Sequence, residues 1–139
     1  MENNMAMEYP MFCYQCEQTA GGKGCTKMGV CGKTPEVAAL QDLLIFQIKG
    51  ISSYAKEIVE KGENVDKDIV AFVENCLFTT LTNVNFDADV HVELLRRSQE
   101  IKEQLRSKVG AIKNTTEHAT YNLSSTKAEM LQDAKKAGI

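Results

Sequence analysis

Apolar residues recur every three or four positions along three long stretches of the chain, which is the spacing of one face of an α-helix. The first stretch opens with Thr34, Pro35 and Glu36: an N-cap residue, a proline and an acidic residue in the order typical of a helix start. Gly62 is typical of the residue that follows a helix, so a helix is predicted from residue 35 to residue 61. Its apolar positions are Leu40, Leu44, Ile48, Ile51, Ala55 and Ile58.

The other two stretches predict a second and a third helix. The second begins after Asp66, a good N-cap residue, and ends near Thr82; the third is capped by Asp87 or Asn85 and ends near Gly110. The apolar positions are Ile69, Phe72, Val73, Cys76, Leu77, Thr80 and Leu81 in the second helix, and Val90, Leu94, Leu95, Ile101, Leu105 and Val109 in the third. We expect a shared core made of Leu44, Ile48, Ile51, Phe72, Val73, Leu77, Leu94, Ile101 and Leu105.

The last part of the chain is less regular. Periodicity is lost over residues 114–123, which predicts an irregular linker, and it returns after Thr126. Thr126 and Glu129 match a capping box that opens a short helix ending near Ala137. No strand-like alternation appears, so the predicted fold class is all-α: an up-down three-helix bundle with an N-terminal cysteine-rich loop and a short trailing helix. The expected divisions are a flexible leader (1–10), the cysteine-rich loop (11–34), the bundle (35–110), and a linker with a short helix (111–139).

Composition limits the partners and the compartment. The chain of 139 residues has a net charge of −3 and contains no Lys/Arg run, which argues against a nucleic-acid partner. Its apolar runs are far shorter than the roughly 18 residues of a membrane-spanning helix. Residues 1–10 lack the basic start and apolar segment of a signal peptide. We therefore expect a cytoplasmic protein of one domain, with no membrane partner.

Four of the five cysteines lie close together, at Cys13, Cys16, Cys25 and Cys31, in the pattern C-x2-C-x8-C-x5-C. In a reducing compartment, such clustered thiols are more often metal or redox ligands than disulfide partners. Structural zinc accepts four thiolates, although its second pair of cysteines is usually closer than Cys25 and Cys31. A four-iron cubane takes the same ligands, although this is not a ferredoxin spacing. The spacing alone leaves both metal sites open.

Charged residues surround the cysteines. Cys31 lies three residues before the predicted N-cap Thr34, where the positive end of a helix favours an anionic group. Lys23, Lys27 and Lys33 add positive charge. We interpret them as solvated surface lysines; the functional alternative is a docking rim or a field that tunes a bound cluster.

Three other residues could be mistaken for ligands. Cys76 lies on the apolar face of the second predicted helix, so we expect a buried core thiol and not a fifth ligand. His91 and His118 have no cysteine or carboxylate partner at a recognisable spacing. Both are predicted to be surface or linker histidines.

Longer motifs around the cysteines point to a known family. The segments are MFCYQCEQT at residues 11–19, GCT at 24–26 and GVCGKTPEVAALQDLL at 29–44, followed by LFTTLTNVNFD at 77–87. In this order they resemble the opening of the hybrid cluster protein family, also called prismane or hydroxylamine reductase. The resemblance spans at least residues 11–110.

The resemblance implies an oxygen-sensitive oxidoreductase of anaerobic metabolism. It implies that Cys13, Cys16, Cys25 and Cys31 hold one [4Fe-4S] electron-relay cluster, because the x8 and x5 spacings resemble the four-iron branch of the family. In that family, hydroxylamine or nitric oxide is reduced at a hybrid iron–sulfur–oxygen cluster whose ligands lie in later domains. This chain looks like an N-terminal fragment without those domains, and we expect it to be inactive alone.

We expect two kinds of partner and keep one alternative function open. The expected partners are a redox donor protein and either the missing catalytic domains or a second copy, bound through exposed apolar surface. The alternative is a zinc-stapled or metal-free helical interaction module that has kept the sequence and lost the redox role.

Overall fold

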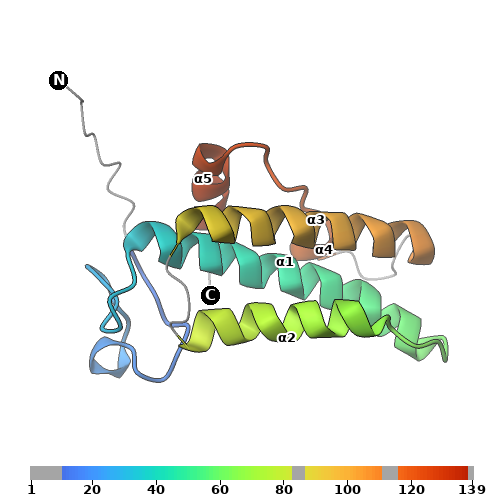
Figure 1. Cartoon of the computed structure of the whole chain (residues 1–139), viewed down its shortest axis with the longest axis horizontal. Helices are drawn as coiled ribbons and strands as arrows, with labels where there is room; N and C mark the ends of the chain where they lie inside the picture. The colour runs from blue at the N-terminus through green and yellow to red at the C-terminus, as the bar shows by residue number, and fades with distance from the viewer. Residues whose placement is uncertain (1–10, 83–86, 111–115, 138–139) are drawn as a thin grey trace.

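The computed structural model describes residues 11–82, 87–110 and 116–137, and within these ranges the fold is all-α, as predicted (Figure 1). The described residues form no strand, and an isolated antiparallel bridge joins Cys13 to Cys25. The predicted leader at 1–10 and the turn at 83–86 lie outside the described residues. The helices are η1 (Ala20–Gly22), α1 (Pro35–Glu60), α2 (Lys67–Thr82), α3 (Ala88–Val109), α4 (Glu117–Thr120) and α5 (Lys127–Ala137).

The ends of α1 follow the predicted signals. The Thr34 side chain accepts a hydrogen bond from the backbone N–H of Val37 at 3.3 Å, and Pro35 is the first helical residue. At the other end, Gly62 has a φ of +80° and donates its N–H to the carbonyl of Val59 at 2.9 Å. The left-handed conformation at Gly62 therefore ends the helix where the sequence predicts.

The other helix starts also match their predicted caps. Asp66 accepts from the N–H of Asp68 at 2.8 Å before α2, and Asp87 accepts from the N–H of Asp89 at 2.9 Å before α3. Before α5, the Thr126 hydroxyl accepts from the N–H of its capping-box partner at 3.2 Å. The carboxylate of that partner accepts from the Thr126 hydroxyl at 2.9 Å.

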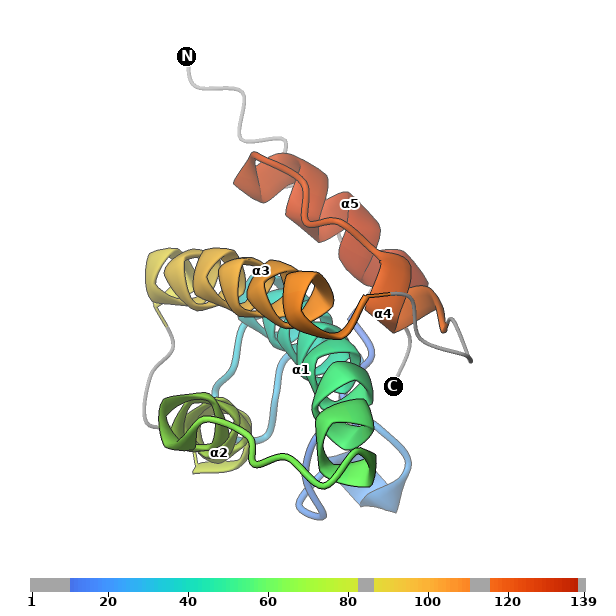
Figure 2. The same cartoon turned by 90° about the vertical axis from the view of Figure 1, so that its right-hand side faces the viewer.

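Helix α1 is the centre of the fold. It packs against α2, α3, α4 and α5, and it lies between α2 and α3 in the view of Figure 1. The short trailing helix α5 runs across the other helices, on the side of α1 away from α2 (Figure 2). Among the described residues, no helix has the length and hydrophobicity needed to cross a membrane.

The core confirms most of the predicted positions. Val73 and Leu94 are half-buried against it, whereas Leu77 is 39% exposed and its prediction was wrong. Helix α2 contacts mainly one neighbour, so its buried face is narrow and Leu77 lies beside it. The predicted residues that are buried are Leu44, Ile48, Ile51, Phe72, Ile101 and Leu105. Other large side chains buried in the same core include Leu40, Leu43, Val92, Leu95 and Met130.

His91 corrects the prediction of a surface histidine. It is fully buried, with Nε2 2.9 Å from Gln41 Nε2 and Nδ1 2.7 Å from the carbonyl oxygen of Asp87. Burial lowers the pKa of His91, which favours the neutral ring. His91 therefore joins α1 to the start of α3.

The predicted linker at 114–123 contains the short helix α4. The Lys102 ammonium, fully buried on α3, donates to the carbonyls of His118 at 3.3 Å and Tyr121 at 2.5 Å. These carbonyls lie at the C-terminal end of α4, where they have no partner within the helix, so a buried cation provides their hydrogen bonds. Helix α4 can approach α1 this closely because position 50 is a glycine: a Cβ there would lie 2.2 Å from the His118 carbonyl oxygen. His118 is half-buried, with its ring edge against Phe46.

Candidate cluster-binding site

The loop before α1 brings Cys13 and Cys25 together through their backbones. Cys13 donates its N–H to the carbonyl of Cys25 at 2.9 Å, and Cys25 donates to the carbonyl of Cys13 at 3.0 Å. The hydroxyl of Thr19, which is buried between them, donates to the Cys13 carbonyl at 2.8 Å. The first and third cysteines of the motif therefore occupy facing positions on two paired segments.

A tight turn places Cys31. Gly29 donates its N–H to the carbonyl of Lys33 at 2.9 Å, and Gly32, with a φ of +92°, donates to the carbonyl of Gly29 at 2.8 Å. A Cβ at position 29 would lie 3.0 Å from the sulfur of Cys31 and 3.0 Å from the Cβ of Lys33. Glycine at positions 29 and 32 therefore lets the chain fold closely around the fourth thiol.

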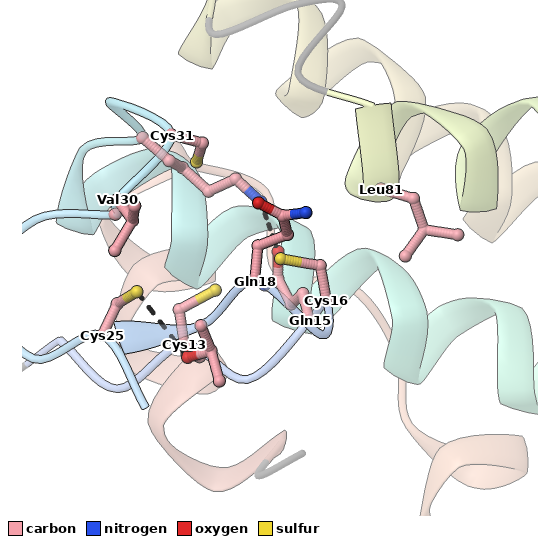
Figure 3. A pocket seen from close by; sticks show the side chains of 11 residues that line it. Cys13, Gln15, Cys16, Gln18, Cys25, Val30, Cys31 and Leu81 are labelled. Carbon is pink, nitrogen blue, oxygen red and sulfur yellow. Dashed lines mark hydrogen bonds between the residues drawn. The ribbon is translucent and has the colours of Figure 1, made fainter. Parts of the chain in front are cut away.

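All four cysteines line one cavity of about 310 Å³, with α2 contributing Leu81 to its wall. Their sulfurs point toward one another across this space, and Leu81 faces it from the other side (Figure 3). Cys13 and Cys25 are buried, Cys16 is half-buried and Cys31 is exposed. All are free thiols, so the predicted ligands are brought together without a disulfide.

Hydrogen bonds to sulfur favour a thiolate at Cys25. Its pKa is lowered by bonds from the backbone N–H groups of Val30 and Ala20 and from the hydroxyl of Thr19. The Ala20 nitrogen lies 3.3 Å and the Thr19 hydroxyl 3.6 Å from the sulfur. Burial raises the pKa of Cys13, although a backbone hydrogen bond at Gln15 opposes this shift. A bound cationic metal would favour the thiolate at both positions.

Lys33 corrects the prediction that the three loop lysines are solvated. Lys23 and Lys27 are exposed, whereas Lys33 is 3% exposed and lines the cavity. Its ammonium donates to the side-chain oxygen of Gln15 at 2.7 Å and to the carbonyl of Thr80, near the end of α2, at 3.3 Å. One of the three lysines is therefore a buried cation in the wall of the site.

Two residues behind this wall, Gln15 and Asp42, were not among the predicted site residues. The amide nitrogen of Gln15 donates to Asp42 at 2.6 Å and to the carbonyl of Ala38 at 3.0 Å, so α1 holds this end of the side chain in place. Burial raises the pKa of Asp42 to about 6, against the opposing effects of the Gln15 hydrogen bond and the Lys33 charge. The position of Gln15 between two cysteines was a usable signal; Asp42 is 27 residues away from it and had none.

Cys76 lies outside the site, as predicted. It is fully buried in the core between the helices and does not line the cavity. Burial raises the pKa of its thiol to about 12, which keeps it protonated.

The donor set suits an iron–sulfur cluster better than one metal ion. Within the described residues, no three His, Cys, Asp or Glu side chains approach closely enough to hold a single ion. A cubane instead offers a separate iron to each thiolate, so its ligands can surround a wider space. Four thiols around one cavity, with N–H groups directed at sulfur, fit that group.

Comparisons with known proteins show which sequences this chain resembles. A "Hydroxylamine reductase" from Syntrophobacter fumaroxidans is 48% identical over 122 residues, which is 88% of this chain and 22% of the relative. One from Desulfovibrio desulfuricans is 41% identical over 133 residues (96% of this chain, 24% of the relative). One from Thermotoga maritima is 59% identical over 83 residues (60% of this chain, 19% of the relative). The chain thus spans between 19% and 24% of these relatives' lengths.

The family comparison covers almost the whole chain. The sequence profile described as the Prismane/CO dehydrogenase family matches residues 11–138, which includes the cysteine loop and every described helix. The chain belongs to the Prismane/CO dehydrogenase family.

Proposed function

We propose that the loop at 11–34 binds one [4Fe-4S] cluster through the thiolates of Cys13, Cys16, Cys25 and Cys31, and that the domain relays electrons. The observation that carries this proposal is the single cavity lined by all four thiols. Membership of the Prismane/CO dehydrogenase family implies iron–sulfur cofactors, which supports it. When bound, such a cluster accepts and releases one electron at a time.

The surroundings of the thiols support an anionic group. The N–H of Ala20 and the hydroxyl of Thr19 are directed at the sulfur of Cys25, and the Lys33 ammonium lies in the wall. Hydrogen bonds and positive charge around cluster sulfurs stabilise the added electron. Cys31 is exposed, so an electron donor can approach this side of the cavity.

A zinc staple is the alternative, and the geometry supports it less well. Four thiolates on zinc must lie about 2.3 Å from one ion. In the described part of the chain the thiols do not converge on one such point. They surround a cavity of about 310 Å³ instead.

We further propose that this domain supplies electrons for the reduction of hydroxylamine or nitric oxide in a longer polypeptide. The support is the name of the relatives, "Hydroxylamine reductase", and the small share of their length that this chain covers. Cleaving an N–O bond requires proton donors and an open metal site, and four thiolates on a cubane leave no open position. We therefore expect the chain alone to be inactive, with reduction at a hybrid cluster held by other domains.

The exposed apolar surface supports a protein partner. Of the ten large apolar side chains exposed among the described residues, seven belong to the cysteine loop or the second half of α2: Phe12, Tyr14, Met28, Val30, Leu77, Phe78 and Leu81. Such a patch beside a redox site suits a redox donor protein, the remaining domains or a second copy of the chain. A cytoplasmic location is part of the proposal, because thiolate ligands persist in a reducing compartment.

The test is metal and sulfide analysis of protein reconstituted with iron and sulfide under anaerobic conditions. We expect about four irons and four sulfides per chain. Replacing Cys13, Cys16, Cys25 or Cys31 with Ser lowers both numbers. The matched control is Cys76→Ala, which removes a core thiol and leaves the iron content unchanged. One zinc per chain without sulfide, or loss of iron in Cys76→Ala but not in Cys25→Ser, would contradict the assignment.

A further inference from the structure

Lys33 is unusual among the charged residues of the cysteine loop because its charge is buried. The side chain is 3% exposed, whereas Lys23 and Lys27 on the same loop are exposed. Its ammonium has two neutral hydrogen-bond acceptors, the amide oxygen of Gln15 at 2.7 Å and the carbonyl oxygen of Thr80 at 3.3 Å. Within the described residues, no carboxylate lies within the 4.0 Å of an ion pair with Lys33.

A buried cation with no carboxylate in ion-pair contact is costly, because two neutral acceptors replace only part of its hydration. The Asp42 carboxylate interacts with the Lys33 charge only from beyond ion-pair distance, with Gln15 hydrogen-bonded to both side chains. A negative charge bound in the cavity would lie beside the ammonium. Lys33 lines the same cavity as the four cysteines. A cluster held by four thiolates carries a net negative charge, which grows by one electron on reduction.

The acceptors fix the ammonium in position. The amide nitrogen of Gln15 is held by Asp42 at 2.6 Å and by the carbonyl of Ala38 at 3.0 Å. These two bonds fix the side chain with its amide oxygen toward Lys33. The carbonyl of Thr80 belongs to the last turns of α2, where backbone oxygens carry partial negative charge. Lys33 therefore joins the cysteine loop, α1 and α2 at the cavity wall.

We propose that Lys33 is the buried counter-charge of the cluster, which makes the cluster easier to reduce and keeps the C-terminal end of α2 against the loop. The proposal rests on the proposed function. A fixed charge in a poorly solvated wall interacts with the added electron far more strongly than a charge exposed to water and salt. Lys33 is thus a positioning residue that sets the potential, and it is not itself a ligand.

The test compares Lys33→Met with Lys27→Met and Lys23→Met in the full 139-residue chain, loaded with iron and sulfide under argon. Methionine keeps the apolar stem and removes the charge. The measurement is the midpoint potential from a spectroelectrochemical titration. We expect Lys33→Met to lower the ratio of reduced to oxidised cluster at least about tenfold at a fixed potential, which is about 59 mV for one electron. The two exposed-lysine controls remove the same charge and shift the potential much less.

A second measurement separates a charge effect from simple loss of packing. Thermal unfolding is followed for the cluster-free and loaded forms of each protein. A counter-charge stabilises mainly the loaded form, so Lys33→Met lowers the melting temperature of loaded protein more than that of cluster-free protein. Lys33→Arg keeps the charge, so its midpoint potential should stay close to that of wild type. If the methionine variant binds cluster poorly, the potential of Lys33→Arg is compared with that of wild type instead.

The outcomes distinguish the two proposals. If wild type binds iron and sulfide but Lys33→Met has the potential of Lys27→Met, the counter-charge role is wrong and the cluster assignment stands. Equal destabilisation of the cluster-free and loaded forms would likewise reduce Lys33 to a structural tether. If wild type binds no cluster, the proposed function and this inference fail together.

Discussion

Buried polar side chains are the residues that sequence periodicity did not place. Lys33, His91 and Lys102 are all nearly or fully buried, and each is hydrogen bonded to a group distant in sequence or to the backbone. A hydrophobic pattern assigns polar residues to the surface, because an isolated buried charge is unfavourable. Partners such as Thr80, 47 residues from Lys33, are known only once the helices are packed. The four cysteines, in contrast, were predicted as a candidate site from residue type and spacing, and they line one cavity.

Lys102 provides a pH prediction at this scale. Burial, followed by the nearby charge of Arg106, lowers its pKa from 10.5 to about 8 in the folded protein, while Glu103 opposes the shift. Between these two pH values the unfolded chain binds the proton that the folded chain has lost. Raising the pH from 8 to 10.5 therefore stabilises the fold through this residue, by at most about 1.4 kcal/mol per pH unit.

The measurement is the free energy of unfolding by urea at several pH values for wild type and Lys102→Met. Taking the difference between the two proteins removes contributions that they share, including the titration of Cys76. Wild type should gain stability relative to Lys102→Met as the pH rises over this range. A constant difference would show that Lys102 has an ordinary pKa and is not desolvated.

At the scale of helices, start and stop signals were more informative than apolar patterns. Thr34, Asp66, Asp87 and Thr126 cap the four longer helices where predicted, because capping is a local interaction. Helix α4 was missed because four residues are too few to show a period, and its stability depends on packing against α1 and on hydrogen bonds from Lys102 and Arg106 of α3. The exposure of Leu77 has a similar cause, since the width of a buried face depends on the neighbouring helices.

The close packing of α4 against α1 gives a prediction for Gly50→Ala. In an isolated helix this change adds about 1 kcal/mol of stability. Here the new methyl group would lie 2.2 Å from the carbonyl oxygen of His118 and 2.9 Å from the Lys102 side chain. We expect a net loss of roughly 1–3 kcal/mol from overpacking. Urea unfolding checks this, with Ser52→Ala at an exposed position of α1 as the control. A gain in stability would mean that α4 does not pack against Gly50.

At the scale of the whole molecule, the distribution of exposed apolar side chains predicts association. Leu77 is one of the seven such residues that belong to the cysteine loop or to α2 near it. We expect the chain to self-associate at high concentration when no partner is present. Leu77→Lys should reduce this association in sedimentation velocity experiments. Val59→Lys, at a more exposed position near the far end of α1, is the control and should have no effect. A monomer at every concentration would contradict the prediction.

The measurement that tests the central claim most directly is electron paramagnetic resonance of the loaded chain, before and after anaerobic reduction. Four thiolates around one cubane predict a cluster that is silent when oxidised and, on reduction by one electron, gives a signal of about one spin per four irons. Cys76→Ala should give the same signal, and Cys25→Ser should lose or alter it. Wild-type protein that contains iron and sulfide but gives no such signal, or a signal unchanged in Cys25→Ser, would contradict the proposal that these cysteines hold an electron-relay cluster.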